Sequence, residues 1–331
     1  MTGTLRLWPD NGAVSRGARP VRGYEMDGHR WSGRLLAGLA TITLVAGCAT
    51  GTMTPGPRAT PPTSTAAPSA ASPSPSPAAA SEWAFVRSSC PGASGQPLLL
   101  VALGTSETAG WGIRTDEPYS PQEAYPAQYA DILCKELGVP VELHSYFPSQ
   151  LASGWFPLAW WNERVATDPA MRADLAAARI VVLWAMGSHD IGPAILGGCS
   201  GDWPDPLKTC FEAATAKIPA ETDRLFTAIA GLVPTGAKVL AAAPYGLPLV
   251  IERWGAEPYW KEMKPIFDGV TDRPLVRKHG FTLVDLEVAF NGPTLDAMPA
   301  AGLFQSDGIH PTAAGALAVA KVFAEADGLG D

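Results

Sequence analysis

From residue 98 onward, short apolar runs alternate with longer segments of helix length. Each run is rich in Val, Leu and Ile, and most end in Gly, Pro or polar residues, as strands do. We predict strands at residues 98–104, 139–146, 180–187, 237–243 and 281–290, and helices at 121–137, 169–178, 209–232, 258–279 and 312–326. This alternation predicts an α/β fold, a three-layer αβα sandwich around a mainly parallel five-stranded sheet.

The first 47 residues have the features of a secretion signal. Arg30 and Arg34 precede an apolar stretch from 35 to 47 that ends in small residues. The stretch is shorter than the roughly 20 residues of a membrane-spanning helix, which disfavours that alternative. The segment "LVAGC" is similar to the lipobox of bacterial lipoproteins, in which the cysteine, here Cys48, becomes the lipidated N-terminus. Met26 would be a more typical start than Met1.

Two further regions follow this signal. Residues 48–81 are almost wholly Pro, Ser, Thr, Ala and Gly, so they lack the apolar side chains that would offset chain entropy, and we predict a flexible tether. Residues 82–331 have the length and apolar content of one globular domain. The chain carries a net charge of −8 without a cluster of Lys or Arg, which argues against nucleic acid as a partner. Membrane contact is expected only through the lipid on Cys48.

Four cysteines remain once Cys48 is assigned to lipid. They are an even number in a chain directed to an oxidising compartment, so two disulfides are the simple interpretation. Cys199 and Cys210 bracket a short loop, which would leave Cys90 with Cys134, although three pairings are open. No CxxC or HExxH spacing occurs and the 5 histidines are scattered, so we predict no metal.

Polar residues gather where three of these segments end. Ser106 follows the first predicted strand, "GSHD" at 187–190 follows the third, and "SDGIHPTAAG" at 306–315 precedes the last helix. Ligands of such sheets bind at the carboxyl ends of the strands. Asp307, three residues before His310, can hold the imidazole Nδ1 and leave Nε2 for Ser106. A nucleophile, a base and an orienting carboxylate are the requirements of serine hydrolysis.

These motifs resemble the SGNH or GDSL hydrolase family. That family carries its nucleophile in a "GDS" motif after the first strand, and its Asp and His in a C-terminal DxxH. The resemblance covers nearly the whole domain. It implies the family's flavodoxin-like sandwich and a serine esterase without cofactor, with Ser106 as nucleophile, His310 as base and Asp307 as orienting acid. No GxSxG motif occurs, which disfavours an ordinary α/β-hydrolase.

The sequence departs from the family pattern at two positions. Thr105 replaces the Asp of "GDS", which changes the support of the loop without changing the reaction type. His189 replaces the Asn of the family's "GxND" block, which donates a hydrogen bond to the oxyanion. His189 can donate in the right tautomer, or it can be a structural histidine bonded to a backbone carbonyl. The backbone N–H of Ser106, and by the family pattern Gly154, are the other predicted oxyanion donors.

The sequence leaves the substrate open. Among 11 tryptophans, Trp111 and Trp155 are candidates to line the site, whereas Trp184 is expected in the core. An acyl ester of a lipid, a glycan or a small molecule would suit such a surface, with acyl transfer as an alternative to hydrolysis. A catalytically inactive surface module that binds a glycan or a partner protein is a second interpretation. A flavodoxin-like binding domain unrelated to hydrolases is a third.

Overall fold

The computed structural model describes most of the predicted domain. The described residues are 84–90, 92–147, 156–184, 187–194, 198–199, 205–243, 245, 248, 251, 273–292, 299–300 and 302–329. The signal region, Cys48 and the tether lie outside them, as do Gly154 and Trp155. Among the described residues, no helix is both long and apolar enough to cross a membrane.

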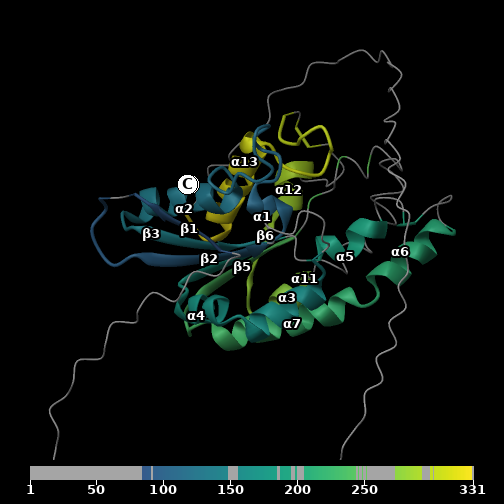
Figure 1. The fold of residues 1–331 in the computed structure, drawn as a ribbon, viewed down its shortest axis with the longest axis horizontal. Coiled ribbons are helices and arrows are strands. Elements are labelled where there is room, and N and C mark those ends of the chain that lie inside the picture. Colours follow the sequence, from purple (N-terminus) through teal and green to yellow (C-terminus); the bar gives the residue numbers. More distant parts are fainter. Residues whose placement is uncertain are drawn as a thin grey trace, which may run out of the picture. The chain divides into compact units, whose positions relative to one another are not determined.

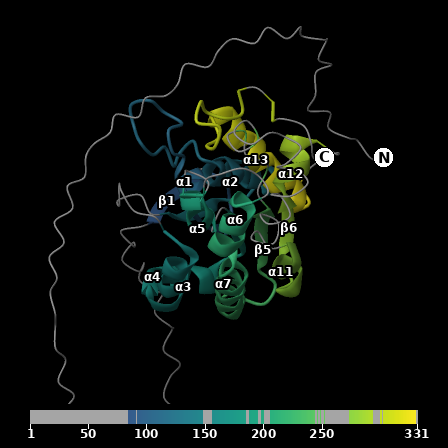
Figure 2. The ribbon, with the colours of Figure 1, turned by 90° about the vertical axis from the view of Figure 1, so that its right-hand side faces the viewer.

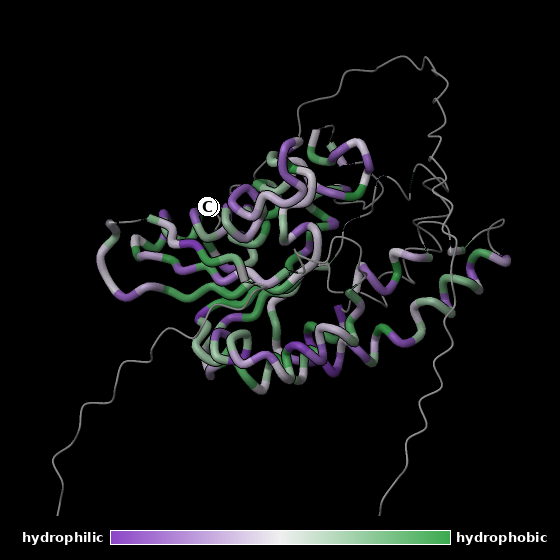
Figure 3. The backbone as a smooth tube through the Cα atoms, viewed as in Figure 1, coloured by the Kyte–Doolittle hydropathy of each residue, from purple (hydrophilic) through white to green (hydrophobic). Residues whose placement is uncertain are grey.

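A six-stranded sheet in the order β1-β3-β2-β4-β5-β6 forms the centre of the fold. Neighbouring strands from β3 to β6 run parallel, which confirms the predicted parallel sheet. The strands in chain order are β1 (Ala84–Ser89), β2 (Leu98–Gly104), β3 (Val141–Tyr146), β4 (Ile180–Trp184), β5 (Lys238–Ala243) and β6 (Thr282–Asp285). Figure 3 shows the inner strands as nearly continuous hydrophobic stretches, as expected for strands covered on both faces.

Strand β1 is an addition to the five strands predicted. It pairs antiparallel with β3, from Ala84 opposite Tyr146 to Ser89 opposite Val141. It is the outermost strand of the sheet and is partly exposed to solvent; its residue Val86 is 46% exposed. Such a strand lacks the continuous apolar run that marks the inner strands, which is why the sequence pattern missed it.

Helices cover both faces of the sheet (Figure 1). One layer contains α2 (Tyr125–Leu137) and α13 (Ala313–Ala326), and the other contains α3 (Leu158–Thr167), α4 (Pro169–Ala177) and α7 (Ile218–Leu232). Successive residues of β2 alternate between the two layers. Leu100 and Ala102 pack in the core with α2 and α13, whereas Val101 and Leu103 pack in the other core. The predicted sandwich is therefore confirmed.

Several helix boundaries differ from the prediction. The predicted strand at 281–290 ends at Asp285, whose side chain accepts a hydrogen bond from Val288 N at 3.3 Å and begins α12 (Leu286–Asn291). The predicted helix at 209–232 is two helices, α6 (Leu207–Thr215) and α7, with Pro219 at the start of the second. Helices α3 and α5 (Ser188–Pro193) were not predicted, and α11 (Arg273–Lys278) is the described end of the predicted helix at 258–279.

The described residues contain two disulfides. Cys90 pairs with Cys134, which joins the end of β1 to α2, and Cys199 pairs with Cys210 at the start of α6. This is the simpler of the pairings that the sequence left open. Stable disulfides are typical of secreted proteins and other oxidising compartments.

Candidate active site

The site lies where the parallel strands end. Helix α1 (Ser106–Ala109) follows β2, α5 follows β4 and α12 follows β6, all at the carboxyl ends of the strands. These strand ends are on the right in Figure 1 and face the viewer in Figure 2. Backbone groups and side chains there are not bonded within the sheet, so they are available to a ligand.

The backbone around Ser106 depends on two glycines. A Cβ on Gly104 would lie 1.9 Å from the side-chain oxygen of Thr108 and 2.7 Å from the carbonyl oxygen of Trp184. Gly110 ends α1 in the left-handed conformation, with φ +71°, which other residues adopt rarely. Strand β2 can therefore turn directly into α1, with Ser106 as its first residue.

Ser106, His310 and Asp307 form a continuous chain of contacts. The imidazole Nε2 of His310 lies 2.9 Å from Ser106 Oγ, and Nδ1 lies 2.6 Å from Asp307 Oδ2. The other carboxylate oxygen of Asp307 accepts from the backbone N–H groups of Ile309 and His310, at 2.9 and 3.0 Å. This tight turn fixes the carboxylate against the ring, as the Asp-x-x-His spacing predicts.

The loop of His310 is also tied to the rest of the fold. Tyr245, buried after β5, donates its hydroxyl to the carbonyl of Ile309 at 2.9 Å. Gln305 donates its side-chain amide to the carbonyl of Trp111 at 2.6 Å, which connects this loop to the segment after α1. Thr312 caps the last helix, accepting from Gly315 N at 3.2 Å.

Electrostatics favour the protonated form of His310. Burial opposes protonation, but the hydrogen bond with Asp307 and the negative charges of Glu107 and Asp307 outweigh it, so the pKa of His310 is raised. For Asp307, burial opposes ionisation, but the hydrogen bonds from His310 and from the backbone outweigh it, so the pKa of this carboxyl is lowered. Such an arrangement stabilises an imidazolium next to a hydroxyl.

His189 lies on α5 with a defined tautomer. The backbone N–H of Phe156 donates to its Nδ1 at 2.8 Å, so this nitrogen carries no proton and the neutral ring is protonated at Nε2. Burial lowers the pKa of His189, which keeps the ring neutral at pH 7. In the structural alternative, a ring nitrogen of His189 would donate a hydrogen bond to a backbone carbonyl. Nδ1 does not do so, because it accepts a hydrogen bond from the backbone of Phe156.

Its neighbours hold α5 in place. Asp190 accepts from the backbone N–H of Leu158 at 2.7 Å and lies 3.3 Å from the ammonium of Lys217. Ser188 Oγ lies 3.1 Å from Thr105 Oγ1, which links α5 to the segment before the serine. Thr105 stands where the family pattern has an Asp, and its hydroxyl hydrogen-bonds with Ser188, which is a changed support of the loop.

Glu107 was not considered in the sequence analysis. Its carboxylate accepts from the hydroxyl of Ser106 at 3.1 Å and from that of Thr105 at 2.7 Å. Only 8% of this residue is exposed. The signal was available, since an acidic residue directly follows the serine in a segment of small and polar residues.

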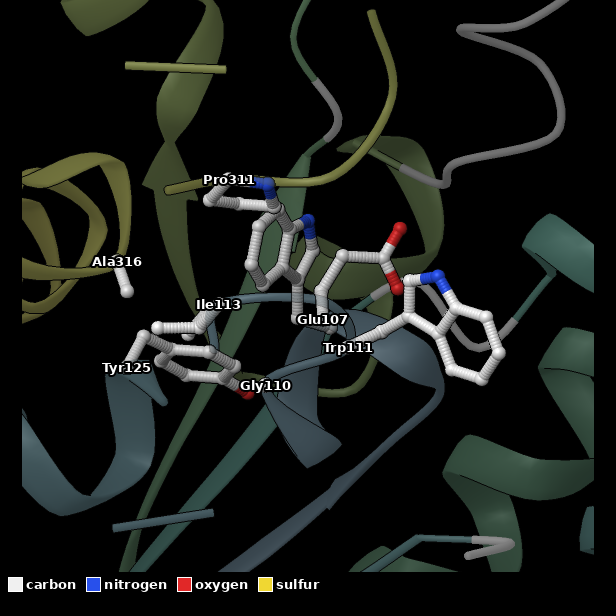
Figure 4. Close-up of a pocket in the computed structure, with 8 residues that line it drawn as sticks. Glu107, Gly110, Trp111, Ile113, Tyr125, Pro311 and Ala316 are labelled. Carbon is white, nitrogen blue, oxygen red and sulfur yellow. The ribbon is translucent and has the colours of Figure 1, made fainter. Parts of the chain in front are cut away.

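Aromatic side chains border this arrangement. Trp111 is 39% exposed, and its ring centroid lies 6.1 Å from that of His310 and 5.2 Å from that of Tyr119. Behind them is a narrow recess lined by Glu107, Gly110, Trp111, Ile113, Tyr125, Trp184, Pro311 and Ala316 (Figure 4). Trp184 is buried, which confirms its place in the core. Trp111 alone of the two candidate tryptophans can be placed.

No protein-family model matches the sequence, and no curated protein matches it. A lipase from a goat rumen metagenome has a similar solved structure, with a TM-score of 0.50 and 16% identity over 70% of this chain and 98% of that one. An extracellular lipase from Streptomyces rimosus has a TM-score of 0.48 and 19% identity, over 69% of this chain and 99% of the lipase. An acetyl xylan esterase from Geobacillus stearothermophilus has a TM-score of 0.48 and 17% identity, over 72% and 97% of the two chains. The goat rumen lipase shows that this chain shares its fold.

Proposed function

We propose that the protein is a serine ester hydrolase that works through an acyl-enzyme intermediate. The observation that carries the proposal is the contact chain from Ser106 Oγ through the His310 ring to Asp307, with distances of 2.9 and 2.6 Å. A lipase uses the same fold, which supports an ester as the substrate. The residues also match the family pattern that the sequence resembles, in the same order along the chain.

In this mechanism Ser106 Oγ attacks the ester carbonyl while its proton passes to Nε2 of His310. Asp307 stabilises the resulting imidazolium at Nδ1. His310 then gives the proton to the leaving alcohol, which separates and leaves Ser106 acylated. Water attacks the acyl-enzyme and gives a proton to His310, which passes it to Ser106 Oγ as the bond from Oγ to the acyl carbon breaks and the acid is released. Attack by a sugar hydroxyl in place of water would give acyl transfer.

The oxyanion of each tetrahedral intermediate needs hydrogen-bond donors. We assign this role to the Nε2–H of His189 and to the backbone N–H of Ser106. The Phe156 contact supports the first assignment, because it leaves the proton of the neutral ring at Nε2. Gly154 is proposed as a third donor on the family pattern alone, since it lies outside the described residues.

We further propose that the enzyme works outside the cytoplasm, held to the membrane by lipid on Cys48. Residues 53–81 would give the domain a typical reach of about 30 Å from the membrane, by the scaling of flexible chains. Two disulfides support an oxidising compartment. The substrate is an acyl ester of a lipid, a glycan or a small molecule.

The test is reaction of the purified full chain with a fluorophosphonate probe and with a short p-nitrophenyl ester. We expect labelling and turnover in the wild type, and turnover below about one thousandth in Ser106→Ala. Ser120→Ala is the matched control, because it also removes a serine hydroxyl, one that is buried and makes no hydrogen bond among the described residues. A folded wild type that neither labels nor turns over would contradict the proposal and favour the binding module.

A further inference from the structure

Glu107 is a buried carboxylate in direct contact with the proposed nucleophile. It is the second residue of α1, and its Oε2 accepts hydrogen bonds from the hydroxyls of Ser106 and Thr105 at 3.1 and 2.7 Å. Burying an ionised carboxylate is costly unless hydrogen bonds compensate, so such a group needs a reason to be kept there. The catalytic sequence described above gives it no role.

The hydroxyl of Ser106 has one proton and two acceptors within reach. These are Glu107 Oε2 at 3.1 Å and His310 Nε2 at 2.9 Å. When His310 is neutral, with its proton on Nδ1 facing Asp307, the hydroxyl donates to one acceptor or the other. When His310 is protonated at both nitrogens, Nε2–H donates to Oγ, and the hydroxyl proton then points to Glu107. Both hydrogen bonds are satisfied together only in this protonated state.

We propose that Glu107 is a second catalytic carboxylate, which holds the Ser106 hydroxyl in position and stabilises the imidazolium of His310 across it. This inference rests on the proposed function. Glu107 exchanges no proton in this sequence. The proton of Ser106 moves to His310 Nε2 as the bond from Oγ to the acyl carbon forms, and it leaves with the alcohol.

The charges around His310 agree with this role. Asp307 faces Nδ1 from the loop before α13, and Glu107 faces the ring from α1; both carboxylates raise the pKa of His310 against the effect of burial. His189, on α5, has its pKa lowered by burial and is neutral at pH 7. Tyr125 on α2 and Tyr245 after β5 have pKa values raised by burial, so they are neutral too. Among the described residues, Glu107 is therefore the charge, besides Asp307, that raises the pKa of the base.

Glu107→Gln in the full chain tests the inference with two readouts. The first is the pKa of the His310 ring by NMR titration, and the second is the pH dependence of fluorophosphonate labelling at Ser106. Since neutral His310 is the active base and Glu107 favours its protonated form, we expect both midpoints to fall by about one pH unit. We expect the labelling rate on the high-pH plateau to fall roughly three- to tenfold.

Two further variants make the result specific. Glu123→Gln removes a carboxylate that is 41% exposed and pairs with Arg114 at 3.6 Å, and it should leave both midpoints unchanged. Glu107→Asp keeps the charge with a shorter reach, so its midpoints should stay near those of the wild type while its plateau falls.

The outcomes separate this inference from the proposed function. Labelling of the wild type with unshifted midpoints in Glu107→Gln would overturn the inference alone. A labelling rate of Glu107→Gln that falls equally at all pH values would show a merely structural carboxylate. A wild type that does not label would overturn the proposed function and this inference together.

Discussion

His189 departs from the family pattern that the sequence resembles, and its tautomer decides whether it can supply the proposed oxyanion donor. An amide always offers N–H groups, whereas a neutral imidazole offers one, at the nitrogen that its surroundings leave protonated. Here the backbone N–H of Phe156 occupies Nδ1 at 2.8 Å, so Nε2 is the protonated nitrogen. Burial lowers the pKa of the ring and preserves this tautomer at neutral pH.

We therefore expect His189→Ala to lower kcat for ester hydrolysis by about 10² to 10³ with little change in KM, the usual loss for one oxyanion donor. His279→Ala is the control, because that histidine pairs with Asp223 at 2.7 Å, outside the site. Steady-state kinetics on a p-nitrophenyl ester measures both. A His189→Ala enzyme within threefold of the wild type would show that the ring has no part in stabilising the oxyanion.

At the scale of elements, the contact between β3 and α4 contains a histidine between two carboxylates. His144 lies 2.6 Å from Asp174 and 2.8 Å from Glu142, and the hydroxyl of Tyr146 also donates to Asp174. Because side chains alternate along a strand, Glu142, His144 and Tyr146 share the face of β3 that α4 covers. His144 therefore has a structural position, away from the candidate active site.

This cluster predicts a pH-dependent stability. Burial opposes protonation of His144, but the hydrogen bonds with Asp174 and Glu142 outweigh it and raise its pKa in the folded state. A raised pKa gives a contribution that is complete below the unfolded value, about 6.5, and is lost as pH rises through the folded value. We expect His144→Gln to reduce the unfolding free energy more at pH 6 than at pH 8, as measured by urea denaturation. An equal loss at both pH values would contradict the prediction.

At the scale of the whole molecule, the described contacts of the site lie within the predicted domain. Every contact described for the proposed catalytic residues lies between Gly104 and Gly315, on loops held by one sheet and its two helical layers. In the proposal, the signal and tether determine only where the domain is kept. Location and catalysis should therefore be separable.

Cys48→Ala tests this separation in a bacterial host that processes lipoproteins. We expect the variant to move from the detergent phase to the aqueous phase on detergent partitioning, because it lacks the acyl chains that provide membrane affinity. Its kcat/KM on a soluble ester should stay within about twofold of the wild type. Thr54→Ala, in the same region, is the control and should remain in the detergent phase. Retention of Cys48→Ala in that phase would mean that another segment provides the anchor.

The sequence by itself determined the parallel sheet, the two helical layers and the chain positions of Ser106, Asp307 and His310. Inner strands such as β2 and β4 are readable because burial on both faces demands continuous apolar runs, and the Asp-x-x-His turn is local. Tertiary structure decided the features that depend on distant partners. Edge strand β1 is defined by its pairing with β3, and the tautomer of His189 is set by the backbone of Phe156. The Ser106 hydroxyl has two acceptors because folding brings His310 next to Glu107, which is far from it in sequence.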